Sequence, residues 1–302
     1  MSRLHWVALA TFAGLGGKSI TRLLEHFGSL EAVFAAPVRE LAGIRRIGRR
    51  TAEAIARVDL AAVEAEIAAF TRQEIAVLTW EDAAYPANLL RAPDAPPVLF
   101  VKGTLKPGDV RAVAIVGTRT PTPAGAALAQ HMARELSSRG WAIVSGLALG
   151  IDAAAHRGAL EAGGRTLAVL GSGVASIYPR QHRPLSGAIE RQGALLSEGH
   201  PGAGVTRRSL IARNRITSGL SRAVIVVESS TDSGSASTAR RALAQGRPVF
   251  AIGGDGAEDG SFLEDGVTAL RLEELGWDAL SEHLDRIVIP PAKKGVWQPR
   301  LL

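Results

Sequence analysis

The chain has 302 residues, of which 46% are hydrophobic, so it can hold one large or two smaller domains with a substantial core. Lysine and arginine total 35 against 29 aspartate and glutamate, and the net charge of +6 is compatible with a polyanionic partner without requiring one. The absence of cysteine excludes disulfides, thiolate metal sites and cysteine nucleophiles, and no apolar run reaches the length of a membrane span, so we expect a cytoplasmic protein.

Residues 1–78 are predicted to form a small all-α domain of short helices separated by glycine. Two segments, 14–28 and 43–56, resemble each other, and the second has the spacing of a helix-hairpin-helix, which directs backbone amides at a helix N-terminus toward a phosphate. The string GGKS at 16–19 is not a P-loop, because Phe12 stands where the first glycine is required. Two interpretations of this domain remain open: a bundle that docks or dimerises, and a module that contacts DNA.

A proline-rich segment follows the helical domain. Residues 79–103 contain Tyr85-Pro86 and the string APPVLFVKG, which is typical of a linker that feeds an edge strand. From residue 111 onward, short segments rich in Val, Ile and Leu alternate with Ala-rich segments. The predicted strands are 112–116, 141–144, 166–170, 194–197, 223–227 and 249–252, and the predicted helices are 123–139, 152–162, 184–192 and 235–245.

This alternation predicts an α/β fold. Short apolar strands that end in Gly, Ser or Glu are typical of a parallel sheet covered by helices on both faces. We therefore predict an extended Rossmann-like, doubly wound, mostly parallel sheet over residues 79–285, preceded by the small all-α domain. Residues 286–302 contain prolines and no periodicity, and we expect them to form a tail.

The residues that follow each predicted strand are the first candidates for a binding site. Ligands of doubly wound sheets lie beyond the carboxyl ends of the strands. Glycines at these ends let backbone amides approach an anion, and hydroxyl and guanidinium groups add further donors. The candidates are Gly117, Thr118, Arg119, Ser145, Gly146, Gly171, Arg180 and Gly234.

An arginine-rich segment adds further candidates. Residues 199–227 contain no aspartate or glutamate, and we predict that Arg213, Asn214 and Arg215 lie in a small-residue loop just before a strand. Arginine at this density beside glycine turns is typical of sites that hold several phosphates at once. Arg207, Arg213, Asn214 and Arg215 therefore complete the candidate site.

Neither a dinucleotide site nor a catalytic site is predicted. The string GTRTPT after the first strand lacks the G-x-G-x-x-G pattern, and no acidic residue ends the second strand to bind a ribose. Asp152 is expected to cap a helix, whereas Glu198 and Glu228 are expected to orient guanidinium groups. His156 and His182 have no partner at metal-ligand spacing. We therefore expect no cofactor, no metal and no catalysis.

Seven motifs follow one another along residues 113–254, and these are VAIVGTR, SGLALGID, TLAVLGSG, LLSEG, ARNRITSGLS, SGSASTA and GRPVFAIGG; the resemblance that they carry extends over about residues 5–275. Together they resemble the DprA/Smf DNA-processing family. The resemblance implies an extended Rossmann fold after a SAM-like domain, a homodimer that binds single-stranded DNA, and loading of a RecA-type recombinase in natural transformation, without catalysis. Carried onto this sequence, the residues that would hold the strand are Arg119, Arg180, Ser145, Gly146, Arg213, Asn214 and Gly234.

Several positions depart from the family pattern. Leu149 stands for the arginine of SGLARGID, His182 for an asparagine, and 210–211 is Leu-Ile where an aromatic-proline pair is usual. These changes affect the shape of the pocket more than its charge. Many members of that family carry a C-terminal winged-helix-like domain, and we do not expect one within residues 286–302. Aromatic residues make up only 5% of the chain and Tyr178 is the one expected near the groove, so phosphate contacts are predicted to outweigh stacking.

Two other classes of protein serve as alternatives. A nucleoside-monophosphate phosphoribohydrolase has a related Rossmann-like fold with glycine-rich phosphate loops. Its P-G-G-x-G-T motif is absent here, where the corresponding strand end reads SSTDSGSAS over residues 229–237. A partner-binding module without DNA affinity is the third interpretation.

Overall fold

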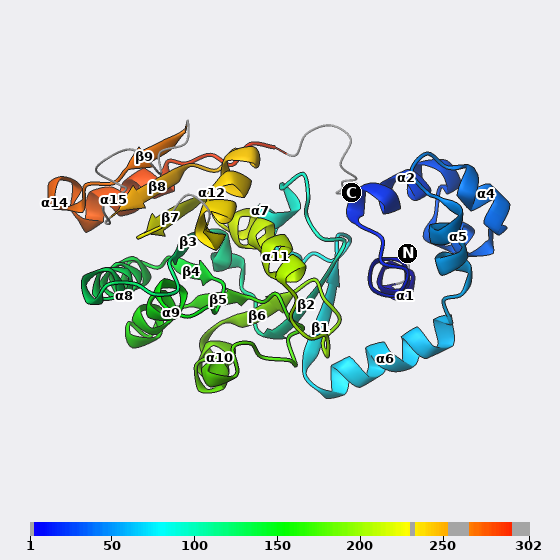
Figure 1. The fold of residues 1–302 in the computed structure, drawn as a ribbon, viewed down its shortest axis with the longest axis horizontal. Helices are drawn as coiled ribbons and strands as arrows, with labels where there is room; N and C mark the ends of the chain where they lie inside the picture. The colour runs from blue at the N-terminus through cyan, green and yellow to red at the C-terminus, as the bar shows by residue number, and fades with distance from the viewer. Residues whose placement is uncertain (1–2, 230–232, 253–265, 292–302) are drawn as a thin grey trace.

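The structure is a computed structural model, and it describes residues 3–229, 233–252 and 266–291. Figure 1 shows a helical module at the N-terminus, in blue, beside a larger domain built on a sheet. The helical module contains α1 (Arg3–Val7), η1 (Ala8–Phe12), α2 (Gly17–Phe27), α3 (Leu30–Ala35), α4 (Val38–Gly43), α5 (Arg49–Ala56) and α6 (Leu60–Arg72).

Glycine starts the two helices of the predicted repeats in the same way. Gly16 before α2 and Gly48 before α5 are both extended, and neither helix has a side-chain cap at its N-terminus. Gly28 ends α2 in the left-handed conformation, with a φ of 77° that favours glycine. The periodic apolar residues of α2, including Ile20 and Leu24, are buried in the core. The predicted helical domain is confirmed.

In the described part of the chain, the larger domain contains a nine-stranded sheet in the order β1-β2-β6-β5-β4-β3-β7-β8-β9. β1 and β2 pair antiparallel, as do β2 and β6, and every other pair is parallel. The strands are β1 (Ile75–Thr79), β2 (Val98–Gly103), β3 (Ala112–Gly117), β4 (Ala142–Ser145), β5 (Thr166–Val169), β6 (Ala194–Ser197), β7 (Ala223–Val227), β8 (Val249–Ile252) and β9 (Val267–Ala269). The mostly parallel doubly wound sheet is confirmed.

Helices cover both faces of the sheet (Figure 1). In β3, Val113 and Ile115 pack with one cluster of apolar residues, whereas Ala112, Ala114 and Val116 pack with the other, because successive side chains of a strand alternate between faces. On the first face lie α8 (Pro123–Ser138), α9 (Ile151–Glu161) and α15 (Trp277–Asp285), and on the second lie α7 (Ala87–Leu90), α11 (Arg207–Leu220) and α12 (Gly234–Ala244). The remaining helices are η2 (Pro107–Val110), η3 (Arg180–His182), α10 (Arg183–Gln192) and α14 (Leu272–Leu275).

The predicted strands and helices from residue 111 onward agree with the structure to within one residue at each end. The segment before them differs from the prediction. Val98–Gly103 is not an edge strand, because it lies between β1 and β6 and pairs with both. The edge is instead β1, which begins at Ile75, inside the stretch predicted to be helical.

The arginine-rich segment was predicted as a loop, and this is wrong, because it forms the 14-residue helix α11. A capping box starts the helix: the hydroxyl of Thr206 accepts from the N–H of Ser209 at 3.0 Å, and the hydroxyl of Ser209 accepts from the N–H of Thr206 at 2.9 Å. Ile216 and Leu220, four residues apart, anchor the helix on the sheet.

The helical module packs directly against the sheet domain. The rings of Trp6 and Trp80 meet edge to face at 5.7 Å, and those of Phe70 and Phe100 meet at 5.5 Å. The indole N–H of Trp6 donates to Glu81 at 3.0 Å. One cluster of buried apolar residues therefore runs from the helical module into the second face of the sheet.

Candidate functional site

A pocket of about 50 Å³ opens at the carboxyl ends of β3, β4 and β5. Arg119 follows β3, Gly146 follows β4 and Gly171 lies just beyond β5, while Arg213 reaches the same space from α11. The structure thus brings these predicted residues together, and we call this space the strand-end pocket. Its remaining lining residues are Ala148, Leu149, Ser172, Tyr178, Pro179, Val205 and Leu210.

Arg213 is the buried cation of the strand-end pocket. Its side chain is only 7% exposed, and its Nη1 donates to the backbone oxygen of Val169 at 2.6 Å. Among the residues the structure describes, nothing accepts a hydrogen bond from its Nε. Burial is the main cause of the lowered pKa of Arg213; the carboxylate of Asp152 opposes this shift and the charge of Arg119 adds to it. The pocket therefore holds incompletely compensated positive charge, which favours an anion.

Asp152 shapes the loop under the pocket and does not cap a helix as predicted. Helix α9 begins at Ile151, so Asp152 lies inside its first turn. Its carboxylate accepts the backbone N–H of Gly146 at 3.1 Å and that of Ala148 at 3.3 Å. Burial raises the pKa of Asp152, while the charge of Arg213 acts in the opposite direction. The carboxylate thereby fixes Gly146 against the guanidinium group.

His156 lies under the same region and is fully buried. The hydroxyl of Thr166 donates its proton to the backbone oxygen of Ile143. That hydroxyl must therefore accept the hydrogen bond from Nδ1 of His156, which lies 2.7 Å away, so Nδ1 carries the ring proton. Nε2 is buried, and nothing in the described ranges bonds to it. A second ring proton would have no acceptor, and burial, with repulsion from His182 and Arg213, lowers the pKa of His156 to about 3.

The neutral state of His156 makes stability depend on pH. Because its folded pKa of about 3 lies below the ordinary 6.5, the unfolded chain binds the proton first, and stability present above pH 6.5 is lost as the pH falls. From pH 7 to pH 5 this group is expected to remove about 2 kcal/mol of unfolding free energy. We expect His156→Gln to lose that much less than the native protein over this interval, as measured by urea unfolding at both pH values. Equal losses in the two proteins would contradict the assignment.

The switch point of the sheet, between β3 and β7, is filled by a side chain of the protein itself. The backbone N–H of Thr122, which caps α8, donates to the Glu228 carboxylate at 2.8 Å, and its hydroxyl donates to the other oxygen. A Cβ on Gly125 would lie 2.2 Å from that carboxylate, so Glu228 sits where dinucleotide-binding sheets hold a phosphate. Within the described ranges no arginine pairs with Glu228, contrary to the prediction, whereas Glu198 pairs with Arg215 as predicted.

Several predicted residues lie behind the pocket and support it. Ser145 is fully buried and donates to the backbone oxygen of Ile115 at 2.7 Å. The backbone N–H of Thr118 donates to the oxygen of Glu228 at 2.9 Å. Asn214 is buried and donates to the backbone oxygen of Gly234 at 3.0 Å, which ties α11 to the start of α12. These contacts position the strand ends and α11 relative to each other.

The other predicted residues lie outside the lining of the strand-end pocket. Arg180 and Arg207 are exposed, the former in η3 after Tyr178 and Pro179, and the latter at the start of α11. A Cβ on Gly117 would lie 2.0 Å from the oxygen of Val227, so this glycine allows two strands to pass closely. Arg215 lies on a different side of α11 from Arg213 and lines another cleft.

Sequence reasoning placed Leu149, Tyr178 and Leu210 at the pocket and missed Val205. Leu149 and the predicted Tyr178 border the pocket and remain 37% and 47% exposed. Val205 and Leu210 also line it. Val205 can be recognised as a lining residue only once the segment after it is known to form the helix α11.

Within the residues that the structure describes, no group of three or more His, Asp or Glu side chains could hold a metal ion. None of the described helices combines the length and the apolar character needed to cross a membrane.

Comparisons with known proteins match both the helical module and most of the sheet domain. A family model described as DNA recombination-mediator protein A matches residues 76–264, and one described as a SAM-like helix-hairpin-helix tandem matches residues 7–58. Protein Smf of Synechocystis sp. is 38% identical over 254 residues, which are 82% of this chain and 64% of that relative. The chain therefore spans less than two thirds of that relative's length.

Two solved structures also resemble the chain. DNA processing protein A from Streptococcus pneumoniae aligns with a TM-score of 0.76 and 34% identity, over 89% of this chain and 95% of that one. The protein of the same name from Helicobacter pylori, whose single-stranded DNA binding mode was described, aligns with a TM-score of 0.60 and 29% identity, over 70% and 97% of the two chains. The family model, the identity and the shared fold lead to one conclusion: this chain belongs to the DprA/Smf family.

Proposed function

We propose that this protein binds single-stranded DNA at the strand-end pocket and acts as a recombination mediator without catalysis. The observation that carries the proposal is that exposed Arg119 and buried Arg213 line the same pocket, where their positive charges repel each other. Glycines also line this pocket. A phosphate between the two arginines would relieve that repulsion. The Helicobacter pylori relative, whose single-stranded DNA binding mode is known, supports the same ligand class.

The apolar border of the pocket favours a single strand over a duplex. Leu149 and Tyr178 are exposed beside the arginines, and they can contact bases only if the bases are unpaired and turned away from a partner strand. Exposed Arg180 and Arg207 would extend the row of cations along the strand. Phosphate contacts would then supply most of the affinity, with little dependence on base sequence.

We expect the protein to prefer a single-stranded oligonucleotide to its duplex, with an affinity that falls steeply as salt rises. Three or four phosphate contacts give a slope of about −2 to −3 in a plot of log K against log salt. Fluorescence anisotropy with both forms of one labelled sequence measures preference and slope together. Equal affinity for the two forms, or a slope near zero, would contradict the proposal. In a separate assay with AMP, release of adenine would favour a phosphoribohydrolase.

The downstream role is part of the same proposal. We propose that this protein, as a homodimer, loads a RecA-type recombinase on the bound strand during natural transformation or repair. The match to the family model described as DNA recombination-mediator protein A supports this role. Sedimentation at several concentrations tests the dimer. A strand-exchange reaction with a cognate recombinase, run with and without the protein, tests loading.

A further inference from the structure

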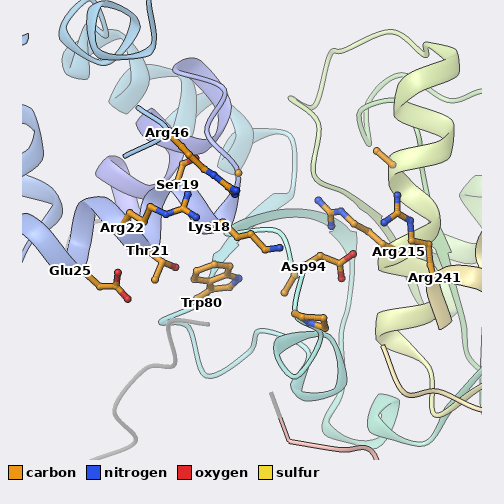
Figure 2. A pocket seen from close by; sticks show the side chains of 15 residues that line it. Lys18, Ser19, Thr21, Arg22, Glu25, Arg46, Trp80, Asp94, Arg215 and Arg241 are labelled. Atoms are coloured by element: carbon orange, nitrogen blue, oxygen red, sulfur yellow. The ribbon is translucent and has the colours of Figure 1, made fainter. Parts of the chain in front are cut away.

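A second, larger cleft lies between the helical module and the sheet domain. Its volume is about 660 Å³, and it is separate from the strand-end pocket. Figure 2 shows that one wall comes from the start of α2 and from Arg46, while the other comes from α11 and α12. Trp80 lies in the floor between the two walls (Figure 2).

Positive charge gathers in this cleft from both domains. The cations that line it are Lys18, Arg22, Arg46, Arg215 and Arg241. Two carboxylates also line it: Glu25, and Asp94, which already accepts a hydrogen bond from Gln245 at 2.8 Å.

The cations of the cleft are poorly neutralised. In the described part of the chain, no carboxylate forms an ion pair with Lys18, Arg22, Arg46 or Arg241. Their positive charges therefore repel one another across the concave cleft. Arg215 pairs with Glu198 through Nη2, while its buried Nη1 has no partner among the residues described. The concave shape concentrates the field of these charges, so an anion is the ligand that the cleft favours.

The start of α2 adds backbone donors to this charge. Helix α2 has 11 residues, begins at Gly17, and has neither a side-chain cap nor an acidic residue in its first turn. The N–H of Ser19 already donates to the oxygen of Gly16 at 2.9 Å, so in the described residues it is the N–H groups of Gly17 and Lys18 that have no partner within the helix and lie at the positive end of its dipole. Gly17 is required there, because a Cβ would lie 2.5 Å from the ring of Trp80. Glycine thus lets this helix start come close to the cleft floor.

Helix α11 connects the two sites. Leu210 and Arg213 line the strand-end pocket, whereas Ala212 and Arg215 line the interdomain cleft, so the two sites occupy opposite sides of one helix. A helix with its side chains is about 10–12 Å across. A flexible strand that leaves the pocket can therefore pass around the N-terminal half of α11 and reach the cleft after a few nucleotides.

We propose that the interdomain cleft binds the phosphodiester backbone of the same DNA strand beyond the strand-end pocket, so that the helical module and the sheet domain hold one strand together. This inference rests on the proposed function and adds a second contact region to it. It also favours DNA contact over the other interpretation of the helical module, through the start of α2 and through Arg46 in the segment 43–56.

The test removes one cation from each wall. In Lys18→Ala/Arg241→Ala both substituted side chains are exposed, so the fold is expected to stay intact, which thermal unfolding checks. The matched control is Arg39→Ala/Arg72→Ala, which removes two exposed arginines that do not line the cleft and have no ion pair in the described residues. Both variants lower the net charge equally, so long-range attraction to DNA changes alike in both.

Anisotropy is measured with oligothymidylates of about 6 and about 20 nucleotides, because single-strand sites commonly span about 4–16 nucleotides. With the longer strand, the cleft variant is expected to bind about tenfold more weakly than the control, with a salt slope reduced by about 1.4. With the shorter strand, the two variants are expected to bind alike. Equal binding of the longer strand by both variants would overturn the inference.

Two further outcomes separate this inference from the proposed function. If the native protein binds neither strand, the proposed function fails and the inference fails with it. If the native protein binds both strands and the cleft variant loses only binding of ATP, measured by thermal shift, the cleft is a site for a free nucleotide and the inference is wrong. Loss confined to the longer strand supports it.

Discussion

Gly146→Ala is expected to abolish tight binding of single-stranded DNA and to destabilise the fold. A Cβ at this position would lie 1.7 Å from Nη1 of Arg213 and 2.3 Å from its Cζ, far inside contact distance. Neither side can yield at low cost. The N–H of Gly146 is held by Asp152, and the guanidinium is buried and donates to Val169.

The expected loss of stability follows from the charge that would be displaced. Moving Arg213 breaks its bond to Val169 and separates it from Asp152, and separating a buried charge from its partner costs about 3–5 kcal/mol. Urea unfolding measures this loss, and anisotropy at a temperature where the variant remains folded measures the loss of DNA binding. The loss of stability and the loss of DNA binding have one cause, because the displaced guanidinium of Arg213 is the buried cation of the strand-end pocket.

Gly204→Ala is the matched control for this substitution. Gly204 lies in the loop before α11, and a Cβ there would have no atom within 4 Å. The control is expected to change stability by less than about 1 kcal/mol and to bind DNA like the native protein. Native stability and affinity in Gly146→Ala would show that Arg213 does not hold the position described here.

The sequence predicts the sheet well because its strands are short, apolar and bounded by small residues. The limits of β6, β7 and β8 agree with the predicted ranges 194–197, 223–227 and 249–252. In a parallel sheet covered on both faces, almost every strand residue is buried, so the apolar run and the strand coincide. The strand ends then locate Arg119, Gly146 and Gly171 beside one another with no knowledge of side-chain packing.

The arginine segment could not be predicted in the same way. The string ARNRITSGLS has few apolar residues, and its helix depends on a capping box and on two contacts, those of Ile216 and Leu220, that only the sheet provides. A loop gives no reason to separate Arg213 from Arg215. A helix does, because residues two positions apart point about 200° away from each other. The assignment of these arginines to different sites therefore required the structure.

Arg119→Ala is expected to weaken single-strand binding by about tenfold or more while leaving the fold intact. Arg119 is exposed, lies two residues after the end of β3 and lines the strand-end pocket. Among the described residues it has no ion-pair partner, so its removal breaks no ion pair there. Its charge helps to lower the pKa of Arg213, so the substitution also relieves repulsion, and we expect unchanged or slightly higher stability. Anisotropy against salt is expected to give a slope shallower by about 0.7, the value for one phosphate contact.

Replacing Arg119 by lysine tests whether its guanidinium group contacts a phosphate specifically or only attracts DNA by its charge. Arg119→Lys keeps the charge but loses the planar pair of donors that fits a phosphate, so it is expected to bind between the native protein and Arg119→Ala. Arg180→Ala is expected to lose affinity as well, because Arg180 follows the pocket residues Tyr178 and Pro179. Arg183→Ala removes an exposed arginine that lies outside the pocket, and it serves as the control for net charge. If Arg183→Ala weakened binding as much as Arg119→Ala, the affinity would come from overall charge, and the strand-end pocket would not be the DNA site.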